Sequence, residues 1–303
     1  MLQNFEKYSK NFIRLQLMSR EIFKSGDLIR LIDQKGKIHQ ITLLAGQKFF
    51  TNHGSIDHDE IIDKTVGSVF ESSSGMKYSA FHPSLEEYVL KMPRGAAVIY
   101  PQDARNMIGL ADIAPGDRVL EAGVGSGSLT LHVLRALANQ GELVSYEIRE
   151  EFAQIARKNV EKFKSFDNWI LINDDLANLK SEKKFDAVLL DLLNPWDYLE
   201  IIEKVLQPGR SLVCYVATTT QMSRVVETMK SRECWFNPMA SEDLHREWHL
   251  QGLAVRPNHR MIGHTGFLIQ ARLMAPGVKA PFKKMKPAKG AYGPDWQEMG
   301  DLK

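Results

Sequence analysis

The sequence predicts an α/β fold with a doubly wound, mostly parallel sheet, preceded by a small domain of β-strands. Three observations support this fold class. From Pro101 on, short apolar runs of strand length alternate with amphipathic stretches of helix length, the pattern of repeated βαβ units. Residues 185–191 (FDAVLLD) are apolar almost throughout, as expected for a parallel strand covered on both faces. Residues 25–82 instead alternate short β-type runs with turn residues.

In the β-rich region, Lys35-Gly36 between two apolar runs predicts a hairpin. Ser84 followed three residues later by Glu87 is a capping-box signature, so a short helix is expected within residues 83–93. The β-type runs are residues 27–33 (DLIRLID), 38–44 (IHQITLL), 45–55 (AGQKFFTNHGS), 66–72 (VGSVFES) and 76–83 (MKYSAFHP).

In the α/β region, strands and helices alternate along the chain. Strands are expected at residues 118–123, 142–147, 169–174, 185–191 and 211–217. Helices are expected at residues 128–139, 150–163, 194–209, where Pro208-Gly209 ends the helix, and 219–231. The segment up to about Met274 closes the sheet.

The predicted domain organisation has four parts. Residues 1–24 form an N-terminal extension, 25–82 the β-rich domain and 83–276 the α/β domain. Residues 277–303 form a basic C-terminal tail.

Composition leaves the partner open. The net charge of the 303-residue chain is +2, so a nucleic-acid partner needs a local basic face rather than an overall excess of charge. The two cysteines lack metal-type spacing and suit a reducing compartment. Charges interrupt the apolar residues at the N-terminus, so neither a signal peptide nor a membrane span is expected there, and a cytoplasmic location is.

A glycine-rich loop follows the first strand of the α/β region. Gly123, Gly125 and Gly127 give G-x-G-x-G, which differs from the G-x-G-x-x-G of dinucleotide sites and lacks the lysine of a Walker loop. The remaining common ligand is S-adenosylmethionine, whose carboxylate can meet backbone N–H groups of the loop. Glu147, after the second strand, is placed to accept the ribose hydroxyls, and Asp175, after the third, to reach the adenine amino group. The alternative is a tight turn for helix packing, with Glu147 a solvated strand end.

The fourth strand ends in DLLNPW, with Asp191 where ligands bind in open α/β sheets. An acid at this place is next to the donor and faces the acceptor. Amino-directed methyltransferases use a related element with an aromatic residue after proline, here Trp196. The alternatives are that Asp191 caps the following helix and that Trp196 only packs.

These motifs together resemble the tRNA (adenine-58-N1)-methyltransferase family. The resemblance covers residues 20–276 and rests on residues 100–130 (YPQDARNMIGLADIAPGDRVLEAGVGSGSLT), LVSYEIREEFAQIARKNVEKF, DAVLLDLLNPW, TTTQMSRVVE and RPNHRMIGHTGFL. It implies a class I S-adenosylmethionine-dependent methyltransferase (Rossmann-like) domain with a small N-terminal β domain, tRNA as substrate and a homotetramer. It departs from the family pattern at Val124, where threonine is expected.

The resemblance also implies site residues. Asp191 matches the catalytic acid, and Tyr100 matches a tyrosine near the acceptor base. The expected donor-binding residues are Gln102, Glu121, Gly123, Gly125, Ser126, Gly127, Ser128, Leu129, Glu147, Phe152, Asp175 and Asp191.

The chemistry of the residues agrees with this expectation. Methylation of adenine N1 places positive charge on the ring, and a carboxylate that accepts from the N6 amino group stabilises that charge. The base has to leave its stack in folded tRNA, where Tyr100 can stack on it. No metal is required, and the segment from His245 to His249 does not fit the zinc protease motif, because Glu247 stands two residues after the first histidine and not directly after it.

Two other functions stay open from the sequence. One is a protein methyltransferase of the same fold, such as the isoaspartyl-directed enzymes, which have a similar glycine loop. The other is a catalytically inactive tRNA-binding subunit, against which the intact loop, Glu147 and Asp191 argue. His259 and His264 either line the acceptor cleft or anchor the fold.

Overall fold

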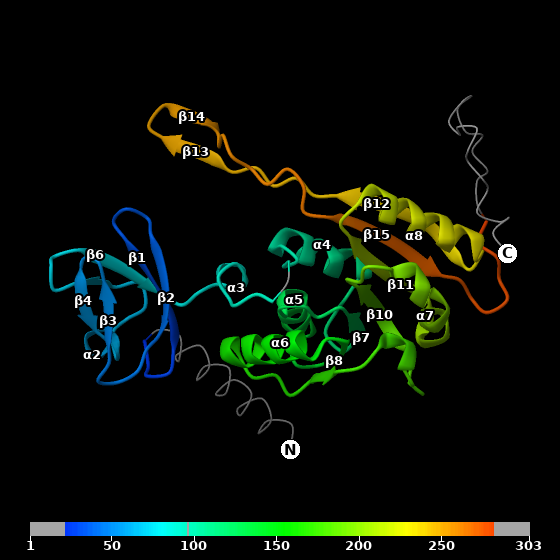
Figure 1. The fold of residues 1–303 in the computed structure, drawn as a ribbon, viewed down its shortest axis with the longest axis horizontal. Helices are drawn as coiled ribbons and strands as arrows, with labels where there is room; N and C mark the ends of the chain where they lie inside the picture. The colour runs from blue at the N-terminus through cyan, green and yellow to red at the C-terminus, as the bar shows by residue number, and fades with distance from the viewer. Residues whose placement is uncertain (1–21, 96, 282–303) are drawn as a thin grey trace, which may run out of the picture. The chain divides into compact units, whose positions relative to one another are not determined.

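The computed structural model describes residues 22–95 and 97–281, so most of the expected N-terminal extension and basic tail lies outside the described residues. The chain divides into two compact units, Met1–Lys91 and Met92–Lys303 (Figure 1). Each unit has its own hydrophobic core, so each is treated in turn.

The first unit is built of antiparallel strands. Its four-stranded sheet has the order β2-β1-β6-β5, and β3 and β4 form a separate hairpin. The strands are β1 (Leu28–Asp33), β2 (Ile38–Thr42), β3 (Lys48–Thr51), β4 (Gly54–Asp57), β5 (Val69–Glu71) and β6 (Lys77–Phe81), and the helices are α2 (His58–Ile61) and α3 (Leu85–Val89). Side chains of these elements, with Phe23 from the segment before β1, form a core that includes Ile29, Leu31 and Tyr78.

Both local predictions for this unit are confirmed. The Lys35-Gly36 turn joins β1 to β2, with Gly36 at a φ of 79° that glycine adopts without strain. Helix α3 begins with a complete capping box, in which the Ser84 hydroxyl accepts from Glu87 N and the Glu87 carboxylate accepts from Ser84 N.

The second unit is a seven-stranded sheet with the order β12-β15-β11-β10-β7-β8-β9. The run from β11 to β9 is parallel, and β15 and β12 add antiparallel strands at one side. The strands are β7 (Arg118–Ala122), β8 (Glu142–Tyr146), β9 (Trp169–Ile172), β10 (Phe185–Leu190), β11 (Leu206–Val216), β12 (Trp235–Glu242) and β15 (Phe267–Leu273), and β13 (Trp248–Gln251) pairs with β14 (Ala254–Pro257) as a hairpin.

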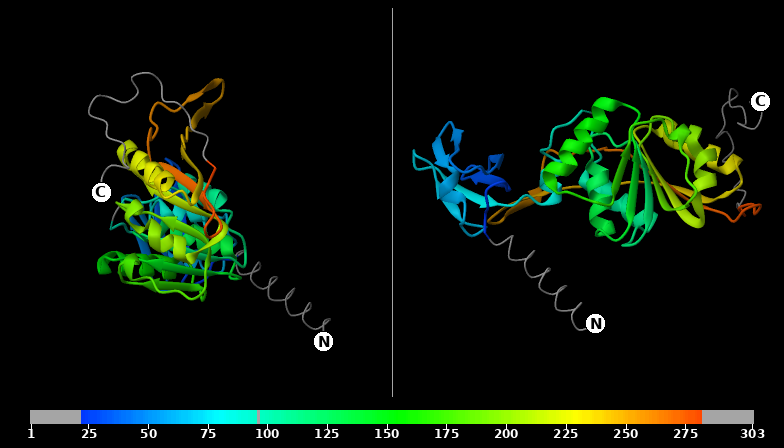
Figure 2. Two further views of the ribbon diagram at one scale, coloured as in Figure 1. Left: turned by 90° about the vertical axis from the view of Figure 1, so that its right-hand side faces the viewer. Right: turned by 90° about the horizontal axis from the view of Figure 1, so that it is seen from below.

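Helices cover both faces of this sheet. Figure 2 shows α5 and α6 on one side of the strands and α7 and α8 on the other. Apolar residues of α7 and α8 pack against one face of β7, β10 and β11 in a single core. The helices are α4 (Pro101–Ala111), α5 (Ser128–Leu137), α6 (Glu150–Phe163), α7 (Leu199–Val205) and α8 (Thr219–Ser231), with short 3-10 turns η1 (Leu176–Asn178) and η2 (Pro195–Tyr198). The predicted doubly wound α/β fold with an N-terminal β domain is therefore confirmed.

The end of the helix before β11 was predicted wrongly. Pro208-Gly209 does not end that helix, because α7 stops at Val205 and the two residues lie inside β11. Leu206 already pairs with Phe185, and an irregularity in the register then separates this pair from Ala187 and Ser211. A proline without an N–H donor is tolerated where the ladder is irregular.

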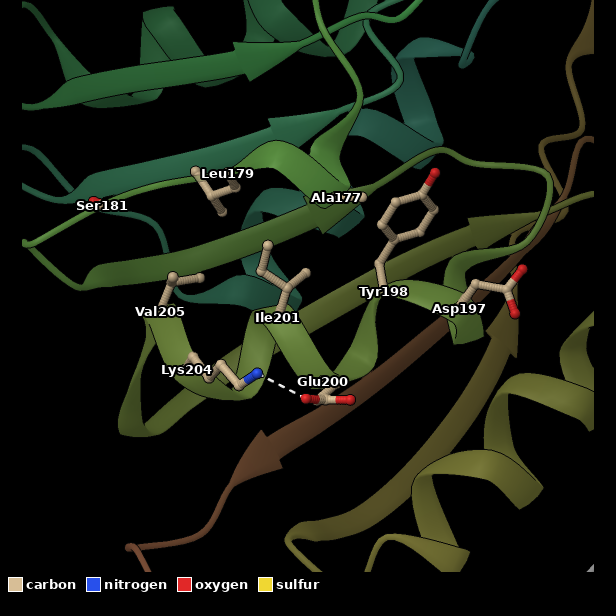
Figure 3. A pocket seen from close by; sticks show the side chains of 9 residues that line it. All are labelled: Ala177, Leu179, Ser181, Asp197, Tyr198, Glu200, Ile201, Lys204 and Val205. Carbon is tan, nitrogen blue, oxygen red and sulfur yellow. Dashed lines mark hydrogen bonds and ion pairs between the residues drawn. The ribbon is translucent and has the colours of Figure 1, made fainter. Parts of the chain in front are cut away.

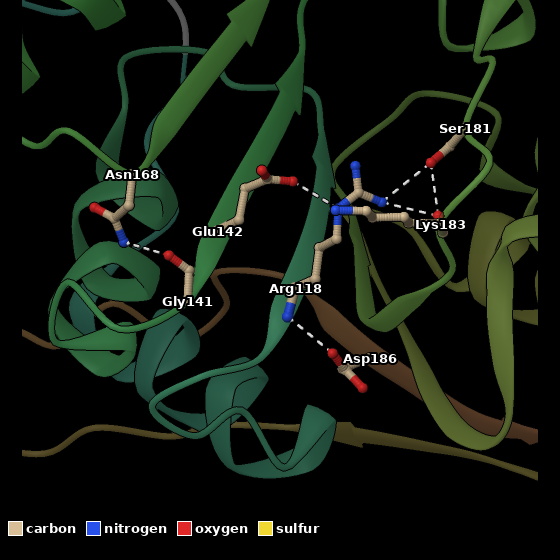
Figure 4. A network of polar contacts seen from close by, with 7 residues as sticks. All are labelled: Arg118, Gly141, Glu142, Asn168, Ser181, Lys183 and Asp186. Carbon is tan, nitrogen blue, oxygen red and sulfur yellow. Dashed lines mark hydrogen bonds and ion pairs between the residues drawn. The ribbon is translucent and has the colours of Figure 1, made fainter.

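Polar contacts tie β7 to its neighbours at the end where the chain enters the sheet (Figure 4). The Arg118 guanidinium donates to Glu142 at 2.6 Å and to the Lys183 carbonyl at 2.9 Å. The Arg118 backbone N–H donates to Asp186 at 2.9 Å. Asn168 donates to the Gly141 carbonyl at 2.9 Å, joining the turns before β8 and β9. These contacts all lie at the N-terminal ends of the parallel strands, and the C-terminal ends lie at the opposite side of the sheet.

In the described part of the chain, no helix has both the length and the apolar character needed to cross a bilayer.

Candidate active site

A cavity of about 750 Å³ opens at the edge of the sheet where the parallel strands end. Open α/β sheets bind their ligands at this edge. Strands β7, β8 and β10 lead into it through Gly123, Glu147 and Asp191, and β11 contributes Tyr215. The other lining residues include Arg94, Tyr100, Arg149, Leu192, Leu193, Asn194, Tyr198, Gln221, Ile262, His264 and Thr265.

A second groove, of about 670 Å³, lies beside α7 and η1 (Figure 3). Two of its charged side chains, Glu200 and Lys204, are bonded to each other at 2.7 Å. The other side chains in it are mostly aliphatic, and only Asp197 and Tyr198 also line the first cavity. In the first cavity, by contrast, Glu147 and Asp191 come from the ends of two parallel strands, β8 and β10. The candidate site is therefore placed there.

The glycine loop brings the end of β7 close to β10. Gly123 has a φ of 84°, and a Cβ added to it would lie 1.9 Å from the Asp191 carbonyl oxygen. Gly127, with a φ of 85°, precedes α5, and a Cβ there would lie 3.3 Å from Val160 of α6. Gly125 has a φ of 54° and open space around its Cβ position. Packing thus requires glycine at position 123, the positive φ favours it at position 127, and the middle glycine faces open space.

Glu147 closes the loop from the end of β8. One of its oxygens accepts from the backbone N–H groups of Val124 and Gly125, both at 3.1 Å, and the other accepts from Arg149 N at 3.1 Å. The side chain is 3% exposed and still borders the cavity. Glu147 is therefore not a solvated strand end. The N–H groups of Val124 and Gly125 are therefore bonded to Glu147 and are not open to the donor carboxylate, contrary to the expectation from the sequence.

Asp175 does not line the cavity itself but is hydrogen-bonded to Tyr198, which does. One of its oxygens accepts from Ala177 N at 2.8 Å and caps η1. The same oxygen accepts from the hydroxyl of Tyr198 at 3.1 Å, and this tyrosine lines the cavity. Burial and the neighbouring Asp175 carboxylate raise the pKa of Tyr198, so its hydroxyl stays protonated as the donor of this bond.

Asp191 follows β10 and is half-buried in the cavity wall. Its backbone N–H donates to the Ala122 carbonyl at 2.8 Å, which fixes the residue beside the glycine loop. Its carboxylate accepts no hydrogen bond from any described residue. Burial, together with the negative charge of Glu147, raises the pKa of Asp191 to about 7, although Arg149 opposes the shift. Asn194, not Asp191, is the residue before η2, so the capping alternative for Asp191 is wrong.

Tyr100 and Trp196 have different places. Tyr100 is the residue before α4 and lines the cavity. Trp196 packs against the core beneath α7 and α8, with the Arg224 guanidinium 4.3 Å from its ring centre. The packing interpretation of Trp196 is therefore the correct one.

The structure brings four of the predicted site residues to the cavity wall, namely Tyr100, Gly123, Glu147 and Asp191. The others lie behind or beside it. Ser126, Ser128 and Leu129 are buried at the start of α5, where the Ser128 hydroxyl donates to the Ile99 carbonyl at 2.7 Å. Gln102 of α4 and Phe152 of α6 are half-buried, and neither they nor Gly125, Gly127, Glu121 and Asp175 line the cavity.

Glu121 supports the loop from below. It is fully buried in β7 and accepts from the hydroxyls of Thr130, at 2.9 Å, and Ser145, at 2.6 Å. Burial raises its pKa to about 7 in spite of these bonds. Its oxygens are directed to α5 and β8, so its geometry is that of a residue that positions the loop.

His264 is a wall residue whose place the sequence left open. One ring nitrogen is 2.6 Å from the Glu242 carboxylate, and the other is 2.9 Å from the Ala217 carbonyl. Because both partners accept hydrogen bonds, the protonated ring can donate to both of them. These bonds raise the pKa of His264. His264 therefore both lines the cavity and anchors the fold.

Sequence reasoning missed the contribution of Gln221. It completes a capping box with Thr218 at the start of α8 and donates to the Leu193 carbonyl at 2.9 Å. It thereby holds the segment that follows Asp191. The signal was the spacing of Thr218 and Gln221 before a helix, which is that of a capping box.

Among residues 22–95 and 97–281, no three His, Cys, Asp or Glu side chains gather in a way that could hold a metal ion.

Comparison with known sequences covers both units. Residues 78–252 match the family described as the tRNA methyltransferase complex GCD14 subunit, and residues 22–70 match the TrmI-like N-terminal family. The chain is 36% identical over 250 residues to the tRNA (adenine(58)-N(1))-methyltransferase TrmI of Thermus thermophilus. The alignment covers 80% of this chain and 95% of that protein. The chain is 32% identical over 270 residues to the tRNA (adenine(57)-N(1)/adenine(58)-N(1))-methyltransferase TrmI of Methanocaldococcus jannaschii, over 80% and 94% of the two chains.

Two solved structures are similar over nearly the whole described chain. The tRNA (m1A58) methyltransferase TrmI of Aquifex aeolicus has a TM-score of 0.74 and 28% identity, over 84% of this chain and 99% of that one. A SAM-dependent O-methyltransferase of Thermotoga maritima has a TM-score of 0.81 and 28% identity, over 86% and 97%. The fold is that of S-adenosylmethionine-dependent methyltransferases, and the chain belongs to the tRNA (adenine-58-N1)-methyltransferase family.

Proposed function

We propose that this chain transfers a methyl group from S-adenosylmethionine to N1 of adenosine 58 in the T-loop of tRNA. The observation that carries the proposal is the Asp191 carboxylate, which borders the cavity at the end of β10 without a hydrogen-bond donor among the described residues. The 36% identity to a tRNA (adenine(58)-N(1))-methyltransferase supports the choice of substrate.

Asp191 accepts a hydrogen bond from the adenine N6 amino group and so orients N1. Positive charge develops on the ring as N1 is methylated, and the carboxylate stabilises this charge. Since burial already makes ionisation of Asp191 costly, a cationic ring beside it is favoured over a neutral one. Tyr100, on the same cavity wall, stacks on the base once it has left the T-loop.

The residues of the cavity fit the methyl donor. The sulfonium and ammonium groups of S-adenosylmethionine are cationic, and Glu147 supplies a carboxylate to the cavity wall, with Arg149 beside it for an acidic group. The open space at Gly125 leaves room along the loop. When bound, S-adenosylmethionine supplies an electrophilic methyl group. We assign Glu147 to the ribose hydroxyls and Asp175, with Tyr198, to the adenine end.

Nucleoside analysis tests the proposal. An unmodified tRNA transcript is incubated with the protein and methyl-labelled S-adenosylmethionine, and the label is mapped after digestion. We expect 1-methyladenosine at position 58 and no product from a transcript with guanosine there. Asp191→Asn is expected to lower kcat by about 100- to 1,000-fold, the usual loss of one electrostatic contact in the transition state, while donor binding is kept.

Asp167→Asn is the matched control, because Asp167 is exposed and outside the cavity wall. Label on protein would favour the isoaspartyl-type alternative, and label on an oxygen would favour the chemistry named for the Thermotoga maritima structure. An inactive chain that still binds tRNA would be the non-catalytic subunit. Each of these three results contradicts the proposal.

The assembly and location belong to the same proposal. We expect a homotetramer, with the mass of four 34.4-kDa chains in light scattering. Exposed apolar side chains on β13 and β14 support contact with another copy, since Trp248 and Val255 are each 56% exposed. A chain with a charge of only +2 then holds tRNA by joining basic surfaces of two copies. We also propose a cytoplasmic location for this tRNA-modifying chain.

A further inference from the structure

We propose that a pocket of the first unit binds a phosphate group of the RNA substrate. The pocket has a volume of about 100 Å³ and lies where the β1–β2 turn, the β3–β4 turn and β6 meet. The proposal rests on the proposed function, because tRNA supplies the phosphate. Its polar lining includes Lys35, Lys37, His39, Thr51, Asn52 and His53.

Strand pairing brings these residues together. Asp33 at the end of β1 pairs with Tyr78 of β6, and Leu31 pairs with His39 of β2. The His39 ring lies 6.1 Å, centre to centre, from the ring of Tyr78. The Tyr78 hydroxyl is 3.1 Å from the hydroxyl of Thr51 in the β3–β4 hairpin. The buried Tyr78 therefore joins both turns at the base of the pocket.

The acidic residue of the pocket is already engaged. One Asp33 oxygen accepts from the backbone N–H groups of Lys35 at 2.8 Å and Lys37 at 2.9 Å. These bonds, that of Lys37 foremost, lower the pKa of Asp33, so it remains an anion held by the turn. The two lysine side chains are exposed, and neither forms a hydrogen bond or ion pair with a described residue. Two cations at the mouth of the pocket are therefore available to an anion.

The size and the chemistry of the pocket fit a phosphate group. Its volume exceeds the roughly 10–15 Å³ that one water needs and is below the roughly 300 Å³ of pockets that enclose a whole small-molecule ligand. Lysines combined with amide and imidazole donors are typical of contacts to nucleic-acid phosphate and sugar. Burial, followed by the positive charge of Lys37, lowers the pKa of His39, so the lysines carry the charge at neutral pH. These features favour the RNA backbone over a base as the ligand.

Binding of tRNA to the full chain tests the pocket. The Lys35→Ala/Lys37→Ala variant is compared with Lys64→Ala/Lys91→Ala, which removes the same charge from exposed positions of the same unit outside the pocket. For the first variant we expect a several-fold higher Kd for tRNA. The slope of log Kd against log salt should decrease by about one for each lysine that contacts a phosphate. Its kcat at saturating tRNA and its affinity for S-adenosylmethionine should be unchanged, which also shows that it is folded.

The outcomes separate the pocket from the proposed function. If the wild-type chain makes 1-methyladenosine and both variants bind tRNA alike, the pocket is overturned and the function stands. If no 1-methyladenosine forms but tRNA binding depends on Lys35 and Lys37, the function is overturned and the pocket stands. Binding of inorganic phosphate that depends on the two lysines, without such dependence for tRNA, would assign the pocket to a free anion and overturn the RNA proposal.

Discussion

The glycine loop meets strand β10 backbone to backbone. A side chain at Gly123 would collide with the Asp191 carbonyl at 1.9 Å, whereas one at Gly125 would meet no atom within 4 Å. Both residues have positive φ angles, so alanine is strained at each. Alanine variants at the two positions can therefore be compared: both lose stability through backbone strain, but only the one at Gly123 also displaces Asp191.

Gly123→Ala is expected to lower the free energy of unfolding by roughly 2–4 kcal/mol, from strain and overpacking together. It should also abolish methyl transfer, because Asp191 is displaced. Gly125→Ala should cost only about 1–2 kcal/mol of strain and mainly weaken donor binding. Urea unfolding measures the stability of the two variants, and calorimetric titration with S-adenosylmethionine measures their donor binding. Equal losses of stability in the two variants would contradict the close approach at Gly123.

Activity should depend on pH through Asp191. Its pKa is raised to about 7, and the proposed role requires the ionised form. We therefore expect kcat/KM for tRNA to fall about tenfold per pH unit below this value and to be constant above it. Initial rates at low tRNA concentration measure the profile, and a flat profile would remove Asp191 from its role.

Two controls accompany this profile. Glu121 also has a pKa near 7, and Glu121→Gln should keep the shape of the profile if Asp191 is the group that titrates. The folded state holds these protons at pH values where the unfolded chain, with ordinary carboxyl pKa values, has lost them. Stability therefore decreases as pH rises from about 4 to about 7. Activity should increase over the same interval, so better folding cannot account for the gain.

At the scale of single residues, the sequence predicts that certain side chains reach the site. It predicts less well which hydrogen bonds these side chains form. Asp191 and Glu147 follow from their places at strand ends. The bonds from Val124 and Gly125 to Glu147 do not follow, because they depend on the distance between two loops that are separate in sequence. The same holds for His264, whose two partners lie at the ends of β11 and β12.

At the scale of elements, helices with strong local signals were predicted with their bounds. Helix α6 spans Glu150–Phe163 and α8 spans Thr219–Ser231, as their amphipathic patterns indicate. The start of β11 could not be predicted from the sequence. Pro-Gly is a local signal for the end of a helix, whereas the strand begins at Leu206 because this residue pairs with Phe185, which is distant in sequence. The β13–β14 hairpin was not predicted either. Each of its strands is only four residues long, and the two pair with each other and not with the main sheet, so the local pattern is too short to distinguish a strand from a loop.

At the scale of the whole molecule, the chain has two separate cores. The core of the first unit includes Phe23, Leu31 and Tyr78, and that of the second includes Phe185 and Trp235. The cavity is lined entirely by residues between Arg94 and Thr265, all in the second unit. The proposed phosphate pocket lies entirely in the first. Donor chemistry and part of the RNA affinity are thus assigned to different units.

A fragment of residues 92–303 separates these two contributions. Because it retains its own core and every residue of the cavity wall, we expect it to unfold cooperatively and to bind S-adenosylmethionine as the full chain does. It lacks Lys35 and Lys37, so its Kd for tRNA should rise and the salt dependence of binding should weaken. Circular dichroism, calorimetry and filter binding measure the three properties, with the full chain as control. A fragment that binds tRNA as tightly as the full chain would place all RNA contacts in the second unit, and loss of donor binding would show that the cavity depends on the first.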